Sequence, residues 1–137
     1  MPKVIGLDYG SKRTGVAISD DRGIIASPLA TIETSAVLEY LSALISKEKV
    51  QILVLGEAKR LNGQSSEITA EQEKFAQKLR AKFAEVRIVR VNEMFTSKMA
   101  QQSLIAGGYK KSQRAEKGNL DKMSAAIILQ SYLDQKI

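Results

Sequence analysis

The order of apolar segments along the chain limits its fold more than any other feature of the sequence. Three short apolar runs near the N-terminus are separated by turn-forming residues, and they predict three strands in an antiparallel meander. These runs are 4–7, 14–18 and 24–31. Pro28 lies inside the third run, so we expect that strand at an edge of the sheet, where a missing N–H breaks no ladder hydrogen bond.

After residue 33, segments with helical periodicity alternate with two strand-like runs, 50–55 and 86–91. Residues of the N-cap type precede each predicted helix, and they are Thr34/Ser35, Ser65/Ser66, Thr96/Ser97 and Asn119. The last helix, from Leu120 to about Leu133, is apolar all round at 125–129, which predicts that it is buried. Residues 1–137 therefore predict one α/β domain, with a mixed five-stranded sheet and helices on both faces.

The amino-acid composition excludes several kinds of chemistry. The chain has no cysteine and no histidine, which excludes disulfides, thiolate catalysis, Ser-His-Asp triads and the usual zinc sites. Its net charge is 21 − 15 = +6, which fits an anionic partner such as nucleic acid but is also found in proteins without one. We expect a cytoplasmic protein without a membrane anchor, because the N-terminus has no signal-peptide pattern and no run reaches about 18 apolar residues.

Carboxylates at the ends of predicted strands are the candidate catalytic groups. Asp8 ends the first strand beside Gly10, Glu57 follows the fourth, Glu93 follows the fifth, and Asp121 opens the last helix. Each acid also has an ordinary structural explanation, as a turn residue or as a helix-start residue. Brought to one edge of a sheet, such acids repel one another unless a cation joins them. Mg²⁺ or Mn²⁺ would convert that repulsion into binding and support hydrolysis of a phosphodiester.

Basic residues form two candidate contacts for a phosphate backbone. Lys12 and Arg13 lie in the first predicted turn, beside Asp8. Lys110, Lys111 and Arg114 lie in a glycine-led polar segment before the last helix. A basic segment next to an acidic metal site would bind a nucleic-acid backbone, whereas an isolated run of charge is more often simply solvated.

Three segments resemble one known family over the length of the chain. Residues 4–20 closely resemble the N-terminal motif of the YqgF-type family of small bacterial proteins, described as Holliday junction resolvases and as pre-ribosomal-RNA nucleases. Residues 92–97 stand where that family has a DER-x-T-[TS] block, and residues 120–129 match its closing helix. The resemblance implies a ribonuclease H-like fold with sheet order 3-2-1-4-5. It also implies divalent-metal phosphodiester hydrolysis, with Asp8, Glu93 and Asp121 as metal ligands.

The chain departs from the family pattern at two places. The DER block reads Asn92-Glu93-Met94, so its aspartate and arginine are missing. The Gly-Leu-Pro after the fourth strand reads Gly56-Glu57-Ala58, which introduces a carboxylate. Related junction resolvases of this fold also carry a carboxylate at a strand end. We therefore hold as a hypothesis that Glu57 supplements or replaces Glu93 as a metal ligand.

The function predicted from these features is a nuclease dependent on Mg²⁺ or Mn²⁺ that processes the 5′ end of precursor small-subunit ribosomal RNA. One alternative is a resolvase of four-way DNA junctions, and another is a non-catalytic RNA-binding factor in ribosome assembly. A sugar-kinase or actin-type ATPase lobe shares a turn like Asp8-Tyr9-Gly10, but such proteins need two lobes to enclose ATP. The expected partner is nucleic acid, and the expected state is a monomer or a weak homodimer.

Overall fold

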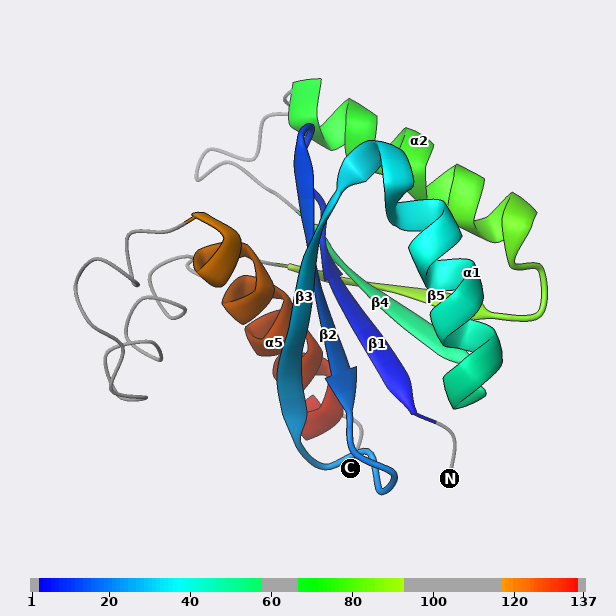
Figure 1. Cartoon of the computed structure of the whole chain (residues 1–137), viewed down its shortest axis with the longest axis vertical. Coiled ribbons are helices and arrows are strands. Elements are labelled where there is room, and N and C mark those ends of the chain that lie inside the picture. Colours follow the sequence, from blue (N-terminus) through cyan, green and yellow to red (C-terminus); the bar gives the residue numbers. More distant parts are fainter. Residues whose placement is uncertain (1–2, 58–66, 93–116, 136–137) are drawn as a thin grey trace.

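The computed structural model describes residues 3–57, 67–92 and 117–135. Within them, five strands form one sheet in the order β3-β2-β1-β4-β5 (Figure 1). The strands are β1 (Val4–Asp8), β2 (Arg13–Ser19), β3 (Ala26–Glu33), β4 (Ile52–Glu57) and β5 (Arg87–Asn92). β2 is antiparallel to β1 and β3, whereas β4 is parallel to β1 and β5. The predicted mixed sheet and its order are confirmed.

Helices cover both faces of this sheet. They are the short 3-10 helix η1 (Thr34–Ala36), α1 (Val37–Glu48), α2 (Glu67–Lys82) and α5 (Lys117–Gln135). Figure 1 shows α1 and α2 on one face and α5 on the other, and all three begin at the same end of the sheet. None of the helices in the described ranges is long and apolar enough to span a bilayer. The helix predicted after Thr96/Ser97 lies outside those ranges.

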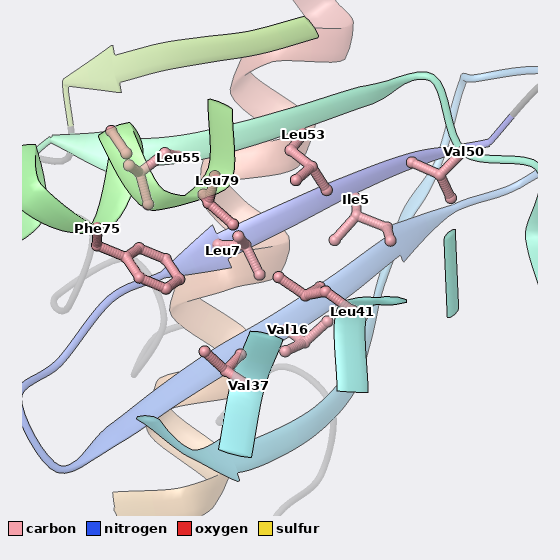
Figure 2. Packing of buried hydrophobic residues seen from close by; sticks show 11 residues of the cluster. Ile5, Leu7, Val16, Val37, Leu41, Val50, Leu53, Leu55, Phe75 and Leu79 are labelled. Carbon is pink, nitrogen blue, oxygen red and sulfur yellow. The ribbon is translucent and has the colours of Figure 1, made fainter. Parts of the chain in front are cut away.

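One layer of buried side chains lies on each side of the sheet, because successive residues of a strand point to opposite faces. Ile5 and Leu7 pack with α1 and α2 in one layer, which we call the α1/α2-side core (Figure 2). Val4 packs in the other layer, the α5-side core, with the middle of α5. The predicted burial of the last helix is confirmed, because Ala125, Ala126, Ile128 and Leu129 are all buried.

Strand β3 is the edge strand that Pro28 predicts. Its pairing with β2 shifts register: Val16 lies opposite Ala30, but the next residue, Ala17, lies opposite Pro28. Leu29 is therefore the extra residue of a β-bulge, and it is 40% exposed.

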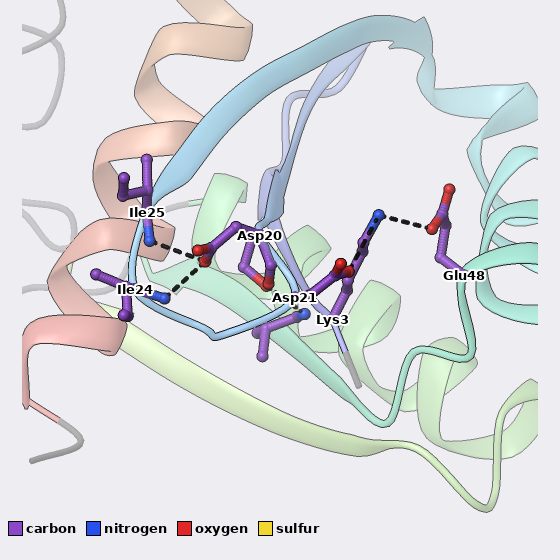
Figure 3. Close-up of polar contacts among 8 residues, drawn as sticks. Lys3, Asp20, Asp21, Ile24, Ile25 and Glu48 are labelled. Carbon is purple, nitrogen blue, oxygen red and sulfur yellow. Dashed lines mark hydrogen bonds and ion pairs between the residues drawn. The ribbon is translucent and has the colours of Figure 1, made fainter. Parts of the chain in front are cut away.

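The strand begins two residues later than its apolar pattern predicts, at Ala26 rather than Ile24. The cause is the Asp20 carboxylate, which accepts the backbone N–H of Ile24 at 2.7 Å and of Ile25 at 3.1 Å (Figure 3). These bonds hold both residues in the turn, and they lower the pKa of Asp20. Figure 3 also shows Lys3 paired with Glu48 and Asp21 near the start of β1.

Two helix starts differ from their predictions. No side chain caps η1 or α1, because the Thr34 hydroxyl bonds instead to the β1–β2 turn described below. Helix α5 begins at Lys117, two residues before the predicted cap Asn119.

Candidate active site

The candidate site lies where the central strand β1 ends. Asp8 is the last residue of β1, is half-buried, and lies opposite Gly15 of β2. Because β1, β4 and β5 are parallel, their carboxyl ends meet at one edge of the sheet. Leu7 pairs with Leu55, and Glu57 pairs with Asn92. The backbone therefore brings the ends of three strands, at positions 8, 57 and 92, to the same edge.

Helix α5 runs antiparallel to β1, which places its start at this edge. Gln130 accepts the N–H of Ala26 at 2.9 Å and donates to the carbonyl of Ile24 at 2.9 Å, at the far end of the sheet. Nearer the candidate site, Ala125 lies against Gly6. Position 121 precedes Ala125 by one helical turn, about 6 Å of rise, and position 8 follows Gly6 by about 6.6 Å of strand. The backbones at positions 8 and 121 therefore both reach the edge of the sheet at which β1 ends.

Gly6 allows this close approach of strand and helix. A Cβ built on Gly6 would lie 2.6 Å from the Cβ of Leu129 and 2.9 Å from the carbonyl oxygen of Ala125. Both distances are too short for any side chain, so only glycine fits here. Val4, Gly6 and Asp8 occupy alternate positions of β1, so Asp8 is on the same sheet face as α5.

The turn between β1 and β2 is fixed by a chain of hydrogen bonds. The Thr34 hydroxyl donates to the carbonyl of Gly10 at 2.6 Å, and its oxygen lies 2.9 Å from the Thr14 hydroxyl. Because Thr34 has one hydroxyl proton, Thr14 donates the second bond. The backbone N–H of Thr34 also donates to the carbonyl of Lys12 at 3.0 Å. These bonds hold the turn that carries Lys12 beside the end of β1. Arg13, predicted to lie in the same turn, is instead the first residue of β2, and both residues are exposed.

Sequence patterns did not indicate this role of Thr34. Its partners lie 20 and 24 residues away in the chain, and a threonine before a helix ordinarily indicates a cap. Gly10 was the available local signal, because a Cβ on it would lie 2.4 Å from the carbonyl oxygen of Arg13. The tight turn therefore requires glycine at that position.

The predicted acids and bases are described to different extents. The structure gives the side chain of Asp8 and the backbone positions of Glu57 and Asp121, while Glu93 lies outside the described residues. No cluster of three or more acids or other metal ligands occurs among the described side chains. The predicted basic contacts Lys110, Lys111 and Arg114 also lie outside the described ranges.

The donor set at this edge fits a hard divalent cation. The chain has no histidine or cysteine, so carboxylates are the anionic ligands available for a metal. Oxygen donors of this kind are those that Mg²⁺ and Mn²⁺ prefer. The backbone arrangement brings one such residue from β1 and one from α5 to the same edge.

A central strand that ends in a carboxylate, within a 3-2-1-4-5 mixed sheet flanked by helices, defines a ribonuclease H-like α/β fold. Solved structures share it. RuvC of T. thermophilus in complex with a Holliday junction substrate aligns with a TM-score of 0.61 at 13% identity, covering 98% of this chain and 96% of that one. The yeast mitochondrial Holliday junction resolvase Ydc2 aligns with a TM-score of 0.52 at 11% identity, covering 97% and 80%.

The chain belongs to the family described as "RuvX: Holliday junction resolvase", whose model matches residues 2–135. A protein of Flavobacterium psychrophilum named "Putative pre-16S rRNA nuclease" is 47% identical over 137 residues, covering 100% of both chains. A protein of Porphyromonas gingivalis with the same name is 42% identical, covering 98% of this chain and 97% of its own length. The family and these names agree with the predicted nuclease, a hydrolase of phosphodiester bonds.

Proposed function

We propose that this chain is a nuclease dependent on Mg²⁺ or Mn²⁺ that processes the 5′ end of precursor small-subunit ribosomal RNA in the cytoplasm. The observation that carries the proposal is the arrangement at one sheet edge. Asp8 ends the central strand there, and α5 brings the backbone of position 121 to the same place. The names of relatives that match the whole chain support the RNA substrate.

Asp8, Glu93 and Asp121 are the residues that would hold the metal, with Glu57 as a further ligand or a replacement for Glu93. When bound, such an ion supplies an activated water and offsets the charge that builds on the phosphate. Lys12, on the turn next to Asp8, and Arg13, at the start of β2, attract the phosphate backbone, because both are exposed. Lys110, Lys111 and Arg114 are proposed to bind the same backbone.

The test is cleavage of two substrates in the presence of Mn²⁺, each incubated separately with the protein. One is an RNA with the 5′ leader of precursor small-subunit ribosomal RNA, and the other is a four-way DNA junction. We expect cleavage of the RNA at the mature 5′ end. The family description favours the junction as the second candidate substrate. Symmetric cutting of two strands normally needs a two-fold dimer, so sedimentation of the complex distinguishes the two activities.

The variant Asp8→Asn should lower the cleavage rate by about 10³-fold, because losing a metal ligand removes several kcal/mol of transition-state stabilisation. Nucleic-acid binding should be kept or strengthened, because a negative charge is removed. Asp21→Asn is the matched control, since Asp21 is exposed near the start of β1. Full activity of the Asp8→Asn variant would refute the mechanism. Salt-dependent binding with no cleavage by the wild type would favour a non-catalytic RNA-binding factor.

The third ligand is identified by comparing Glu57→Gln with Glu93→Gln and Asp121→Asn under the same conditions. Equal losses for both glutamate variants would mean that both carboxylates contribute. A loss for Glu93→Gln alone would exclude Glu57 as a ligand. A loss for Glu57→Gln alone would mean that Glu57 has replaced Glu93.

A further inference from the structure

A pocket of about 240 Å³ lies beside the candidate active site, on the opposite face of the sheet. Tyr9 lines it and directly follows Asp8 in the chain. Whereas Asp8 is on the α5 face, Tyr9 packs with the α1/α2-side core. A nucleic-acid strand that crosses the end of β1 would therefore pass from Asp8 on one face of the sheet to the pocket at Tyr9 on the other.

The floor of the pocket is aromatic. The rings of Tyr9 and Phe75 are stacked, with centroids 4.8 Å apart and an angle of 30° between their planes. Phe75 is buried and reaches from α2 towards Leu7 (Figure 2). It therefore holds the Tyr9 ring that is stacked on it. Tyr9 is only half-buried. Burial and, secondly, the charge of Glu71 raise the pKa of the Tyr9 phenol, so it stays protonated at neutral pH. A partly exposed ring held in this way offers a platform on which a base can stack.

One wall of the pocket carries two positive charges. Lys74 and Lys78 are one turn apart on α2, and both line the pocket and are exposed. Among the described residues neither ammonium group has an ion-pair partner, in contrast to Arg80 on the same helix, which pairs with Glu73. With Glu71 as the one acidic residue among the described residues that line the pocket, the two lysines leave a net positive charge there, which attracts an anionic group such as a phosphate.

The remaining polar groups complete a site for a small ligand. Ser35 lines the wall formed by η1, and its neighbour Thr34 holds the turn that carries Lys12. The Glu71 carboxylate also lines the pocket and can accept a hydrogen bond from an amino or hydroxyl group. The volume is below the range of about 300–1,000 Å³ that is usual for drug-sized ligands. It suits the base and phosphate of one nucleotide rather than a longer segment.

We propose that this pocket binds one unpaired nucleotide of the substrate, adjacent to the phosphodiester that is cleaved. The base stacks on Tyr9, and its phosphate lies between Lys74 and Lys78. The inference rests on the proposed nuclease function for the identity of the strand and for the position of the nucleotide next to the cleaved bond. The pocket itself is described by residues separate from the proposed metal ligands.

The test is binding of a fluorescent single-stranded oligonucleotide in EDTA, where no metal-dependent cleavage occurs. RNA and DNA versions of the same sequence form separate arms. Anisotropy titrations over a range of salt concentrations compare the wild type with the Lys74→Gln/Lys78→Gln variant. We expect binding at least about 10-fold weaker, with the salt slope reduced by roughly 0.7, because the two lysines share one phosphate and each neutralised single-strand phosphate contributes about 0.7.

Lys47→Gln/Lys82→Gln is the matched control, because it removes the same charge from the last turns of α1 and α2. Equal weakening in both double variants would mean that only net charge matters, and it would overturn the proposal. Tyr9→Leu should weaken binding about 10-fold, whereas Tyr9→Phe, which keeps the ring, should restore it. Thermal unfolding of each variant verifies that the fold is intact.

The two proposals fail in different ways. A nucleotide with a photoreactive base, placed next to the cleavage site, should crosslink to the peptide that contains Tyr9. Binding and crosslinking without metal-dependent cleavage would overturn the nuclease proposal and keep the pocket. Normal cleavage and normal affinity in the Lys74→Gln/Lys78→Gln variant would overturn the pocket and keep the nuclease.

Discussion

The substitution Gly6→Ala tests whether the close contact between β1 and α5 builds the site. The new Cβ would lie 2.6 Å from the Cβ of Leu129, whereas carbon atoms pack at about 3.5–4.0 Å. Strand and helix must therefore separate by about 1 Å. Overpacking of this kind costs about 1–3 kcal/mol, and the lower entropy of the unfolded chain returns about 0.5–1 kcal/mol. We expect a net loss of about 1–2 kcal/mol and a fall in Tm of roughly 5 °C.

Activity should fall further than stability predicts. Movement of α5 also moves position 121 relative to Asp8, and a displacement of about 1 Å at a catalytic site can cost about 100-fold in rate. The assays are calorimetric unfolding and the cleavage rate per folded molecule at 25 °C. Ser27→Ala, on the exposed edge strand, is the control and should change stability by less than about 0.5 kcal/mol. A Gly6→Ala protein with unchanged Tm and full cleavage would refute this reasoning.

Three further substitutions test the hydrogen bonds that shape the β1–β2 and β2–β3 turns. Thr34→Val leaves the carbonyl of Gly10 without its donor, and urea unfolding should show a loss of about 1–3 kcal/mol. Gln130→Leu removes the bond to the N–H of Ala26, so hydrogen exchange of that amide should become at least about 10-fold faster. The lowered pKa of Asp20 contributes stability that is present above its ordinary value of 3.8 and is lost as the pH falls through the folded-state pKa. A plot of Tm against pH should therefore be flatter at acid pH for Asp20→Asn than for the wild type.

The sheet was predictable because its signals are local. Pro28 marks the edge strand whatever the rest of the chain does, and the short turns leave the first three strands no alternative to a meander. The errors come from side chains that bond outside their own segment. The Asp20 carboxylate accepts the backbone N–H of Ile24 and keeps Ile24 in a turn, although isoleucine favours a strand. The Thr34 hydroxyl donates its hydrogen bond to the carbonyl of Gly10 instead of capping a helix.

The candidate site was predictable in its residue types but not in its construction. The absence of histidine and cysteine already limits the chemistry to carboxylates, and Asp8 stands out at the end of an apolar strand. The pairing of positions 8 and 121 depends on a contact between Gly6 and α5 across more than a hundred residues. No local pattern specifies such a contact. The residues indicated only that acids at strand ends and at the start of a buried helix could meet at one edge of the sheet, and the family resemblance implied Asp8 and Asp121 among the ligands. Lys74 and Lys78 were not singled out, because a helix with exposed lysines is ordinary until a pocket forms beside it.

The end of β1 can separate two tasks because successive residues of a strand face opposite sides of the sheet. Asp8 is on the face of the sheet that α5 covers, and Tyr9 packs on the side of α1 and α2 with the pocket. A change on the first side should therefore act on the chemical step, whereas a change on the second should act on substrate binding. For Lys74→Gln/Lys78→Gln this means a raised KM with kcat near the wild-type value, the pattern of lost uniform binding. A fall in kcat with unchanged KM would instead mean that the pocket acts on the reacting phosphate, and the two faces would not be separate.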